Sequence, residues 1–362
     1  MTKLAEQAFI KGNEAIAEAA IRAGCRFYAG YPITPQSEIL EYMGAHMAEA
    51  GGTFIQGESE VASISMVWGA AAAGNRAMTS SSGPGFDLKQ EGLSYLSSCD
   101  VPAVVVSMMR YGIGGGDITA GQDSYLQAVK GGGNGDYRLL VLCPNSVQEC
   151  ADLTYGAFDL AEKYRNVVLI LGDGAVGQMM QNVNLPPRVE HDINSYDWVI
   201  KGKPACAKKN KATNLNWYVG DKAWSEHVYS KLHTMQENEQ RWENFMVDDA
   251  ELVFVAIGVS SRVAKQTVKM ARAQGIKLGM VRPITAWPFP RKAFEEVNPD
   301  VKGYMVVEMS IIGQMTEDVY GATKYTKPVY KHCTHIDIPI AENLLEAAKD
   351  ALAGKLKPEV AL

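Results

Sequence analysis

Four short segments of this sequence carry side chains that could bind a small ligand with a carboxylate or a ring nitrogen. The first is Gly-Tyr-Pro-Ile-Thr-Pro at 30–35, which follows an apolar run. The hydroxyl of Thr34 can donate a hydrogen bond to a carboxylate or carbonyl oxygen. It is also suited to cap a helix whose first residue is Pro35. The spacing alone favours the helix cap.

An acidic pair, Glu58 and Glu60, leads into a predicted helix of small residues that extends through 69–74. A glutamate in the first turn of this helix could exchange a proton with a nitrogen of a heterocycle. Taken alone, such a residue more simply complements the positive end of the helix dipole. The segment therefore leaves both interpretations open and favours the dipole.

Two further segments offer hydrogen-bond donors to an anion. Ser-Ser-Ser-Gly-Pro-Gly at 80–85 combines hydroxyls with glycines that leave backbone amides accessible, and it has more small residues than a simple turn needs. Arg110 ends the apolar run 101–109 and precedes the glycine-rich stretch 111–116. Its guanidinium suits bidentate binding of a carboxylate, and a surface ion pair is the alternative.

Two other segments resemble cofactor motifs but lack the required context. Gly-Asp-Gly at 172–174 resembles the diphosphate-and-magnesium motif of thiamine enzymes, but 186–200 lacks the asparagine pair that completes it. The glycines at 112–116 are not followed by the helix and acidic residue of a nucleotide-binding fingerprint. The sequence therefore predicts no metal site in this chain, and a nicotinamide dehydrogenase ranks last among the alternatives.

Alternating strand and helix signals predict the elements that position these segments. A helix is expected over 6–22, with Gly24 as its C-cap. Ser146 and Glu149 form a capping box that opens a helix between two apolar strands, so those strands should be parallel. Segment 30–35 then lies at the carboxyl edge of the sheet, where ligands usually bind. Apolar runs predict strands at 25–30, 53–56, 101–109, 139–143 and 167–171.

The chain divides into three parts by composition. Residues 1–185 predict a doubly wound α/β domain. Residues 186–247 are polar and predict a linker and partly helical connecting arm, which includes the lysine-rich cluster at 208–211. Residues 248–362 predict a smaller second α/β domain, in which Ser260 or Ser261 caps a helix.

Charge, hydropathy and cysteine spacing restrict the class of protein. A net charge of −6 without a lysine or arginine block argues against nucleic acid or an anionic membrane as a partner. No apolar run is long enough to span a bilayer and no signal peptide is recognisable, so a cytoplasmic protein is expected. The cysteines have no metal-ligand spacing and are expected to be buried thiols. They are Cys25, Cys99, Cys143, Cys150, Cys206 and Cys333.

Taken together, the four segments in this order and spacing resemble the α subunit of 2-oxoacid:ferredoxin oxidoreductases. The resemblance covers nearly the whole chain and implies a thiamine-diphosphate pyrimidine-binding-type domain followed by a smaller transketolase C-terminal-like α/β domain. Segments 130–137 and 169–174 resemble the 2-oxoisovalerate, or branched-chain, branch of the family.

The resemblance also implies roles for individual residues. Glu60 matches the catalytic glutamate that hydrogen-bonds N1′ of the cofactor's aminopyrimidine, and Thr34 and Arg110 match residues that hold the 2-oxoacid. The remaining matches are expected to contact the cofactor: Tyr31, Pro32, Ile33, Ser82 and Gly83. No metal ligand is expected among the residues of this chain.

The implied reaction is oxidative decarboxylation of a 2-oxoacid, first of all 3-methyl-2-oxobutanoate, to an acyl-CoA and CO2 with reduction of ferredoxin. The thiamine diphosphate is expected to be shared with a β subunit that carries the diphosphate and Mg²⁺ site. [4Fe-4S] clusters are expected on partner chains, with γ and ferredoxin-like δ subunits in the assembly. An isolated chain should then be inactive.

Alternatives and departures remain. The same chemistry on 2-oxoglutarate, pyruvate or an aryl 2-oxoacid is open, and so is a non-catalytic assembly subunit. Tyr111 and Gly112 follow Arg110 where many relatives have Gly-Pro, which leaves the shape of this loop open. Asn134 stands where relatives of this branch often have histidine, so no proton-handling role is assigned to it.

Overall fold

A computed structural model describes residues 6–192, 196–200 and 222–359 of this chain. The first part is a seven-stranded sheet with strand order β12-β6-β7-β5-β4-β2-β3, in which only the β12–β6 pair is antiparallel. The predicted parallel α/β sheet is therefore confirmed. Its strands are β2 (Phe27–Gly30), β3 (Thr53–Gln56), β4 (Ala77–Ser81), β5 (Ala103–Met109), β6 (Leu140–Leu142), β7 (Val167–Asp173) and β12 (Thr285–Trp287).

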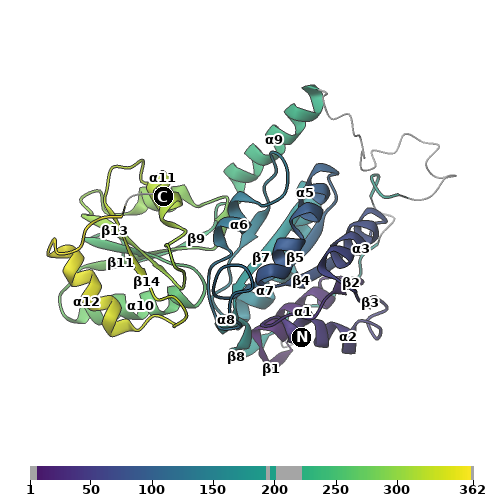
Figure 1. The fold of residues 1–362 in the computed structure, drawn as a ribbon, viewed down its shortest axis with the longest axis horizontal. Helices are drawn as coiled ribbons and strands as arrows, with labels where there is room; N and C mark the ends of the chain where they lie inside the picture. The colour runs from purple at the N-terminus through teal and green to yellow at the C-terminus, as the bar shows by residue number, and fades with distance from the viewer. Residues whose placement is uncertain (1–5, 193–195, 201–221, 360–362) are drawn as a thin grey trace, which may run out of the picture.

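Helices cover both faces of this sheet, as Figure 1 shows. Successive side chains of β5 alternate between the faces, so Val104 and Val106 pack into one apolar cluster and Val105 into the other. The first cluster includes α1 (Gly12–Arg22), α2 (Ser37–His46), α7 (Val147–Tyr164) and α8 (Gly174–Gln178). The second includes α3 (Glu60–Ala72), α4 (Gly83–Leu88), α5 (Gln90–Ser98) and α6 (Tyr125–Lys130).

The predicted helix over 6–22 begins later than expected. Residues Gln7–Lys11 form β1, which pairs antiparallel with β8 (Met180–Asn184), and α1 starts at Gly12. A β-carbon on Gly12 would overlap the carbonyl oxygen of Val176, so this position must be glycine where the chain turns into the helix. The strand depends on a partner far along the sequence, which local periodicity cannot reveal.

The second part is a five-stranded sheet with strand order β14-β13-β10-β11-β9. Helices α10 (Gly258–Ala273) and α12 (Ala341–Leu352) cover one face, and α11 (Thr316–Ala322) and a 3-10 helix (Arg291–Glu296) cover the face that joins the first domain's core. Its strands are β9 (Trp242–Phe245), β10 (Leu252–Val255), β11 (Leu278–Pro283), β13 (Gly303–Glu308) and β14 (Val329–Cys333).

The two sheets exchange strands. β9 lies before residue 247 yet pairs antiparallel with β11 of the second sheet, whereas β12 lies after 247 and pairs antiparallel with β6 of the first. The division at 185 and 247 stays a prediction. Within the connecting arm, α9 (Lys222–Asn238) rises from the junction of the sheets (Figure 1), and the cluster at 208–211 lies outside the described residues.

The first turn of α10 differs from the prediction. The helix starts at Gly258 with Ile257 as its N-cap, and the hydroxyl of Ser261 donates to the carbonyl of Gly258 at 2.7 Å instead of capping. Gly258 has a φ of +53°, and a β-carbon there would overlap a carboxylate oxygen of Asp173. Glycine is therefore required where the second domain approaches the first.

The cysteines in the described ranges are free thiols, four of them buried and Cys333 half-buried. Burial raises the pKa of Cys143 to about 12, as expected for an apolar thiol. Within these ranges no group of His, Cys, Asp and Glu side chains is assembled as a metal site. Cys206 lies outside the described residues. None of the described helices combines the length and apolar character that crossing a bilayer requires.

Candidate functional site

The four chemistry-bearing segments converge at the carboxyl ends of neighbouring strands. Segment 30–35 follows β2, α3 begins four residues after β3, 82–85 follow β4, and Arg110 follows β5. These strands are adjacent in the order β5-β4-β2-β3. The parallel sheet therefore brings together side chains that are up to 80 residues apart in sequence, as ligand sites of open α/β sheets require.

Glu60 is the first residue of α3 and is only 2% exposed. Ser59 caps this helix by accepting a hydrogen bond from the amide of Ala62 at 3.1 Å, which fixes the direction of the first turn. The hydroxyl of Ser81, at the end of β4, donates to Glu60 Oε1 at 2.6 Å. A β-carbon on Gly85 would overlap the same oxygen. The carboxylate is thus held rigidly between a helix start and a strand end.

Lys89 faces Glu60 and was not predicted from the sequence. Its side chain is fully buried, and its ammonium forms an ion pair with Glu60 Oε2. That oxygen has no well-aligned hydrogen bond among the described residues. Burial lowers the pKa of Lys89, and the neighbouring carboxylate opposes this shift. Lysines are mostly exposed in proteins, so a single lysine between two short helices gives no sequence signal of such a pair.

Arg110 lies within contact of two of the other segments. Its Nη1 donates to the carbonyl oxygen of Thr34 at 3.2 Å, and its Nη2 donates to the carbonyl oxygen of Gly115 in the following loop. Its Nε is shielded from solvent and has no hydrogen-bond partner among the described residues. No ion pair of the described side chains involves Arg110, which leaves the guanidinium charge available to an anion.

The expected capping role of Thr34 is wrong. Helix α2 begins at Ser37 with Gln36 as the residue before it, and Thr34 and Pro35 are joined by a cis peptide bond. Thr34 is exposed, as are Tyr31 and Pro32, whereas Ile33 is half-buried. Because the hydroxyl of Thr34 does not cap α2, the structure removes the simpler explanation of this residue.

Ser82 and Gly83 complete the predicted set. Ser82 is buried, and its hydroxyl has no hydrogen-bond partner among the described residues. Gly83 has a φ of +44°, and a β-carbon there would lie 2.6 Å from Arg110 Nε. Any other residue at 83 would displace the guanidinium, so glycine at this position is a condition for the site.

Asp173 of the Gly-Asp-Gly segment has a structural role. It caps α8 by accepting from the amide of Val176 at 2.9 Å, and it accepts from the amide of Val259 in the second domain at 2.7 Å. Burial raises the pKa of Asp173, and these backbone hydrogen bonds oppose the shift. One carboxylate oxygen therefore caps α8 within the first domain, and the other joins the two domains.

A cleft of about 290 Å³ opens beside Arg110 and extends to the second domain. Gly83, Arg110 and Ile113 line it from the first domain, and Ile311 and Ile312 line it from the loop that follows β13. The sequence does not predict this cleft, because the cleft forms between loops about 200 residues apart. Its walls include the loop after Arg110, whose shape the sequence left open.

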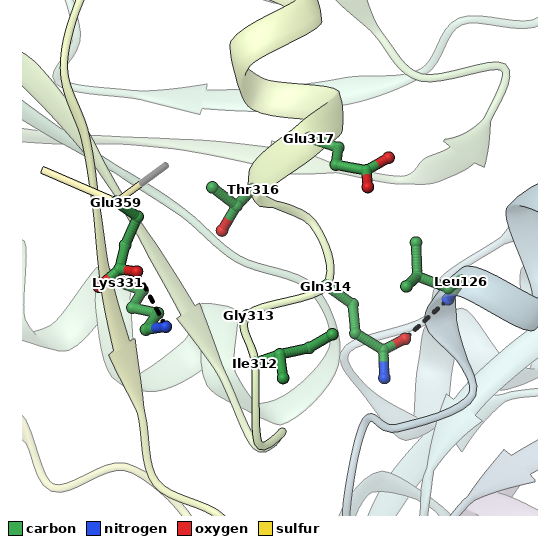
Figure 2. Close-up of a pocket in the computed structure, with 8 residues that line it drawn as sticks. All are labelled: Leu126, Ile312, Gly313, Gln314, Thr316, Glu317, Lys331 and Glu359. Carbon is green, nitrogen blue, oxygen red and sulfur yellow. Dashed lines mark hydrogen bonds and ion pairs between the residues drawn. The ribbon is translucent and has the colours of Figure 1, made fainter. Parts of the chain in front are cut away.

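Two contacts hold the loop after β13 against the first domain. Figure 2 shows Gln314 reaching α6, where its Oε1 accepts a hydrogen bond from the amide of Leu126 at 2.8 Å. Gln314 Nε2 donates to the carbonyl oxygen of Asp123 at 2.8 Å. Across the small cavity of about 60 Å³ in Figure 2, Lys331 pairs with Glu359 at 3.0 Å. The loop position is therefore fixed by specific contacts.

Glu308, at the end of β13, binds residues of the same loop through its carboxylate. Its Oε1 accepts from the amide of Met315 and its Oε2 from the hydroxyl of Ser310, both at 2.8 Å. The residue is fully buried, and burial raises its pKa from an ordinary value of 4.5 to about 7. Between these two pH values the folded chain binds more protons at Glu308 than the unfolded chain does, so stability falls as pH rises.

We predict that Glu308→Gln makes stability less dependent on pH. A raised pKa of this size corresponds to about 3 kcal/mol of unfolding free energy lost by the wild-type chain between pH 4.5 and 7, with no further loss from this group at higher pH. The glutamine side chain can still accept a hydrogen bond from the amide of Met315, but it has no carboxyl group that titrates. Urea unfolding at pH 5 and pH 8 measures the difference. An equal fall between these pH values in both proteins would contradict the assignment.

Two protein-family models match successive parts of this chain. Residues 18–247 match the thiamine-diphosphate-binding domain of pyruvate flavodoxin/ferredoxin oxidoreductases, and residues 250–337 match core domain II of pyruvate:ferredoxin oxidoreductase. The ketoisovalerate oxidoreductase subunit VorB of Methanothermobacter marburgensis is 49% identical over 312 residues, which cover 86% of this chain and 88% of the relative.

Solved structures give the same result for the fold. A 2-oxoglutarate:ferredoxin oxidoreductase from Magnetococcus marinus, with 2-oxoglutarate, coenzyme A and succinyl-CoA bound, matches with a TM-score of 0.83 and 25% identity over 96% of this chain. This chain spans 65% of the length of that solved chain. A split-gene transketolase matches with a TM-score of 0.58 and 14% identity, over 96% of this chain and 100% of the solved one, and so shows a shared fold.

The fold predicted from the sequence, a thiamine-diphosphate-type α/β domain followed by a transketolase-like one, is confirmed by these matches. So is the resemblance drawn from the four segments. The chain therefore belongs to the 2-oxoacid:ferredoxin oxidoreductase family.

Proposed function

We propose that this chain is the α subunit of an enzyme that oxidatively decarboxylates 3-methyl-2-oxobutanoate to an acyl-CoA and CO2, with two electrons passing to ferredoxin. The observation that carries the proposal is the 49% identity to a ketoisovalerate oxidoreductase subunit over 86% of the chain. Identity to the 2-oxoglutarate synthase subunits KorA is lower, between 33% and 37%. The branched-chain substrate is therefore favoured over 2-oxoglutarate, pyruvate and aryl 2-oxoacids.

The residues at the strand ends fit a thiamine diphosphate pyrimidine. A rigidly held carboxylate at Glu60 suits a hydrogen bond with ring atom N1′. The hydroxyl of Ser82, which has no partner among the described residues, and the exposed residues Tyr31 and Pro32 with half-buried Ile33 could contact the ring. When bound, the cofactor supplies the carbanion chemistry of decarboxylation. Ser81 fixes the orientation of the Glu60 carboxylate, and Lys89 provides the opposite charge that a buried carboxylate needs.

Arg110 and Thr34 suit the carboxylate of the substrate. The guanidinium is fixed by two backbone carbonyls and has no side-chain counter-ion among the described residues, so a substrate carboxylate can supply one. The Thr34 hydroxyl lies on the segment whose backbone accepts from Arg110, and it can donate to the same carboxylate or to the 2-oxo group. Together they would orient the 2-oxoacid toward the end of the sheet that holds Glu60.

The proposal includes partner chains. A β subunit would carry the diphosphate and Mg²⁺ site, and [4Fe-4S] clusters would lie on partner chains, with γ and ferredoxin-like δ subunits completing a cytoplasmic assembly. Coenzyme A and ferredoxin are then the other reactants. Isolated, this chain should show no turnover, because half of the cofactor site would be missing.

Reconstitution with the partner chains tests the proposal. We expect 3-methyl-2-oxobutanoate to give the highest kcat/KM in CoA-dependent reduction of ferredoxin, compared with pyruvate, 2-oxoglutarate and phenylpyruvate at equal concentrations. A higher value for one of the other three would reassign the substrate. Full activity of the partner chains without this chain would instead indicate a non-catalytic assembly subunit.

A further inference from the structure

We infer that Ile113, Ile311 and Ile312 form the subsite for the hydrocarbon side chain of the 2-oxoacid, and that the acidic residues of the same cleft disfavour substrates with a second carboxylate. This inference rests on the proposed function, because it takes Arg110 as the anchor of the first carboxylate. It names residues that would discriminate among 2-oxoacids. Two of these residues, Ile311 and Ile312, lie in the second domain.

The cleft is continuous with the carboxylate anchor. Arg110, Gly83 and the three isoleucines line the same cleft. Ile311 and Ile312 are 38% and 39% exposed, and Ile113 is 87% exposed, although each lies in a loop with polar or glycine neighbours. A branched alkyl group in this cleft would remove apolar surface of all three from water, which favours binding by about 25 cal/mol per Å² covered.

The loops that present these side chains are held in place. Ile311 and Ile312 lie between Ser310 and Gln314, which are tied to Glu308 and to α6. On the opposite wall, the amide of Gly112 donates to Asp123 Oδ2 at 2.7 Å, and this fixes the turn that carries Ile113. The subsite therefore exists before the substrate arrives.

Acidic side chains outnumber cationic ones among the described residues that line the cleft. Asp87 and Asp123 line it, and Arg110 is the one cationic side chain among the described residues that do so. Asp87 is bound by the neutral amide of Gln127 at 2.6 Å, so its charge is not compensated by a cation there. If Arg110 holds the first carboxylate of 2-oxoglutarate, the second would lie near two acidic residues, and like charges repel. An uncharged side chain avoids this cost.

A double variant tests the apolar subsite in the reconstituted complex. Ile311→Ala with Ile312→Ala should lower kcat/KM for 3-methyl-2-oxobutanoate by about 10- to 100-fold and leave that for pyruvate within about 3-fold, since loss of a few methylene contacts has effects of this size. The matched control is Ile338→Ala, an isoleucine of the same domain that is 45% exposed and does not line the cleft. It should leave both values unchanged. Equal losses for both substrates in the double variant would overturn the inference.

A charge substitution tests the second half. Ile311→Lys should raise the ratio of kcat/KM for 2-oxoglutarate to that for 3-methyl-2-oxobutanoate by about 10-fold or more, because the new ammonium offers the second carboxylate a partner. An unchanged ratio would argue against placing the side chain of the 2-oxoacid beside residue 311. Should the wild-type complex oxidise none of the 2-oxoacids, the proposed function would fail, whereas the following binding measurement would still test the subsite.

A binding measurement gives a readout other than turnover. The unreactive acid 3-methylbutanoate should show saturation transfer from protein methyl groups to its own methyl groups in NMR spectra of the wild-type complex. The double variant should reduce this transfer at least several-fold, whereas Ile338→Ala should not. Undiminished transfer in the double variant would place the alkyl group elsewhere.

Discussion

Glu60→Gln is expected to lower the turnover of the reconstituted enzyme by about 10²- to 10⁴-fold, the range of a lost acid-base group. Glutamine has nearly the same shape and can still accept from Ser81, but it cannot carry the negative charge that would face a ring nitrogen and Lys89. The loss should appear mainly in kcat, because Arg110 and the isoleucines that we propose to hold the substrate are unchanged.

Glu58→Gln is the matched control for this prediction. Glu58 is two residues away in the same segment, but it is exposed, so its substitution should leave turnover within about 2-fold. Circular dichroism and cofactor binding by the assembled variant would show that the site is formed. Near-normal turnover of Glu60→Gln under these conditions would remove Glu60 from the mechanism.

Lys89→Met should reduce the free energy of unfolding by about 3 kcal/mol or more, because it leaves the Glu60 carboxylate buried without its counter-ion. The methionine is similar in length and apolar, so the packing around residue 89 changes little. Adding Glu60→Gln to this variant should recover most of the loss, since no unpaired buried charge then remains. Urea unfolding of the full chain at pH 7 measures both effects.

The comparison of single and double variants isolates the interaction free energy of the Lys89–Glu60 pair. If Lys89→Met alone cost less than about 1 kcal/mol, the ion pair would contribute little, and the buried lysine would need another explanation. Lys89→Arg is a useful second control because it keeps the charge but not the size. It should be destabilised by crowding in this fully buried position even though the ion pair can persist.

Much of the site was predictable because it depends on one property of parallel sheets. Apolar runs that end in Gly30 and before Arg110 predict strands whose carboxyl ends share an edge, and the structure places these segments together. Strand β4, which lies between these two and precedes Ser82, was not predicted. The family resemblance added roles to individual residues, and those roles stay predictions. The structure supports their proximity, through the contacts of Arg110 with Thr34 and Gly83 and of Ser81 with Glu60.

The features that could not be predicted are those that depend on distant partners. Lys89 matters because of Glu60, 29 residues earlier, and the cleft forms between loops of two domains, which carry Ile113 and Ile311. The strand at Gln7–Lys11 needs β8 as its partner, whereas its local pattern alone predicts a helix. Even Thr34, which has a sound capping sequence, lies before a helix that starts three residues later. In each case tertiary contacts decided over local preference.

The exchange of β9 and β12 between the sheets has a consequence for how selectivity can arise. Rotation of one domain against the other would break the main-chain hydrogen bonds between β12, which lies in the second half of the chain, and β6 of the first sheet. The distance between Arg110 and the loop that carries Ile311 and Ile312 is therefore fixed by the fold. Such a chain would select its substrate by the fixed width of the cleft.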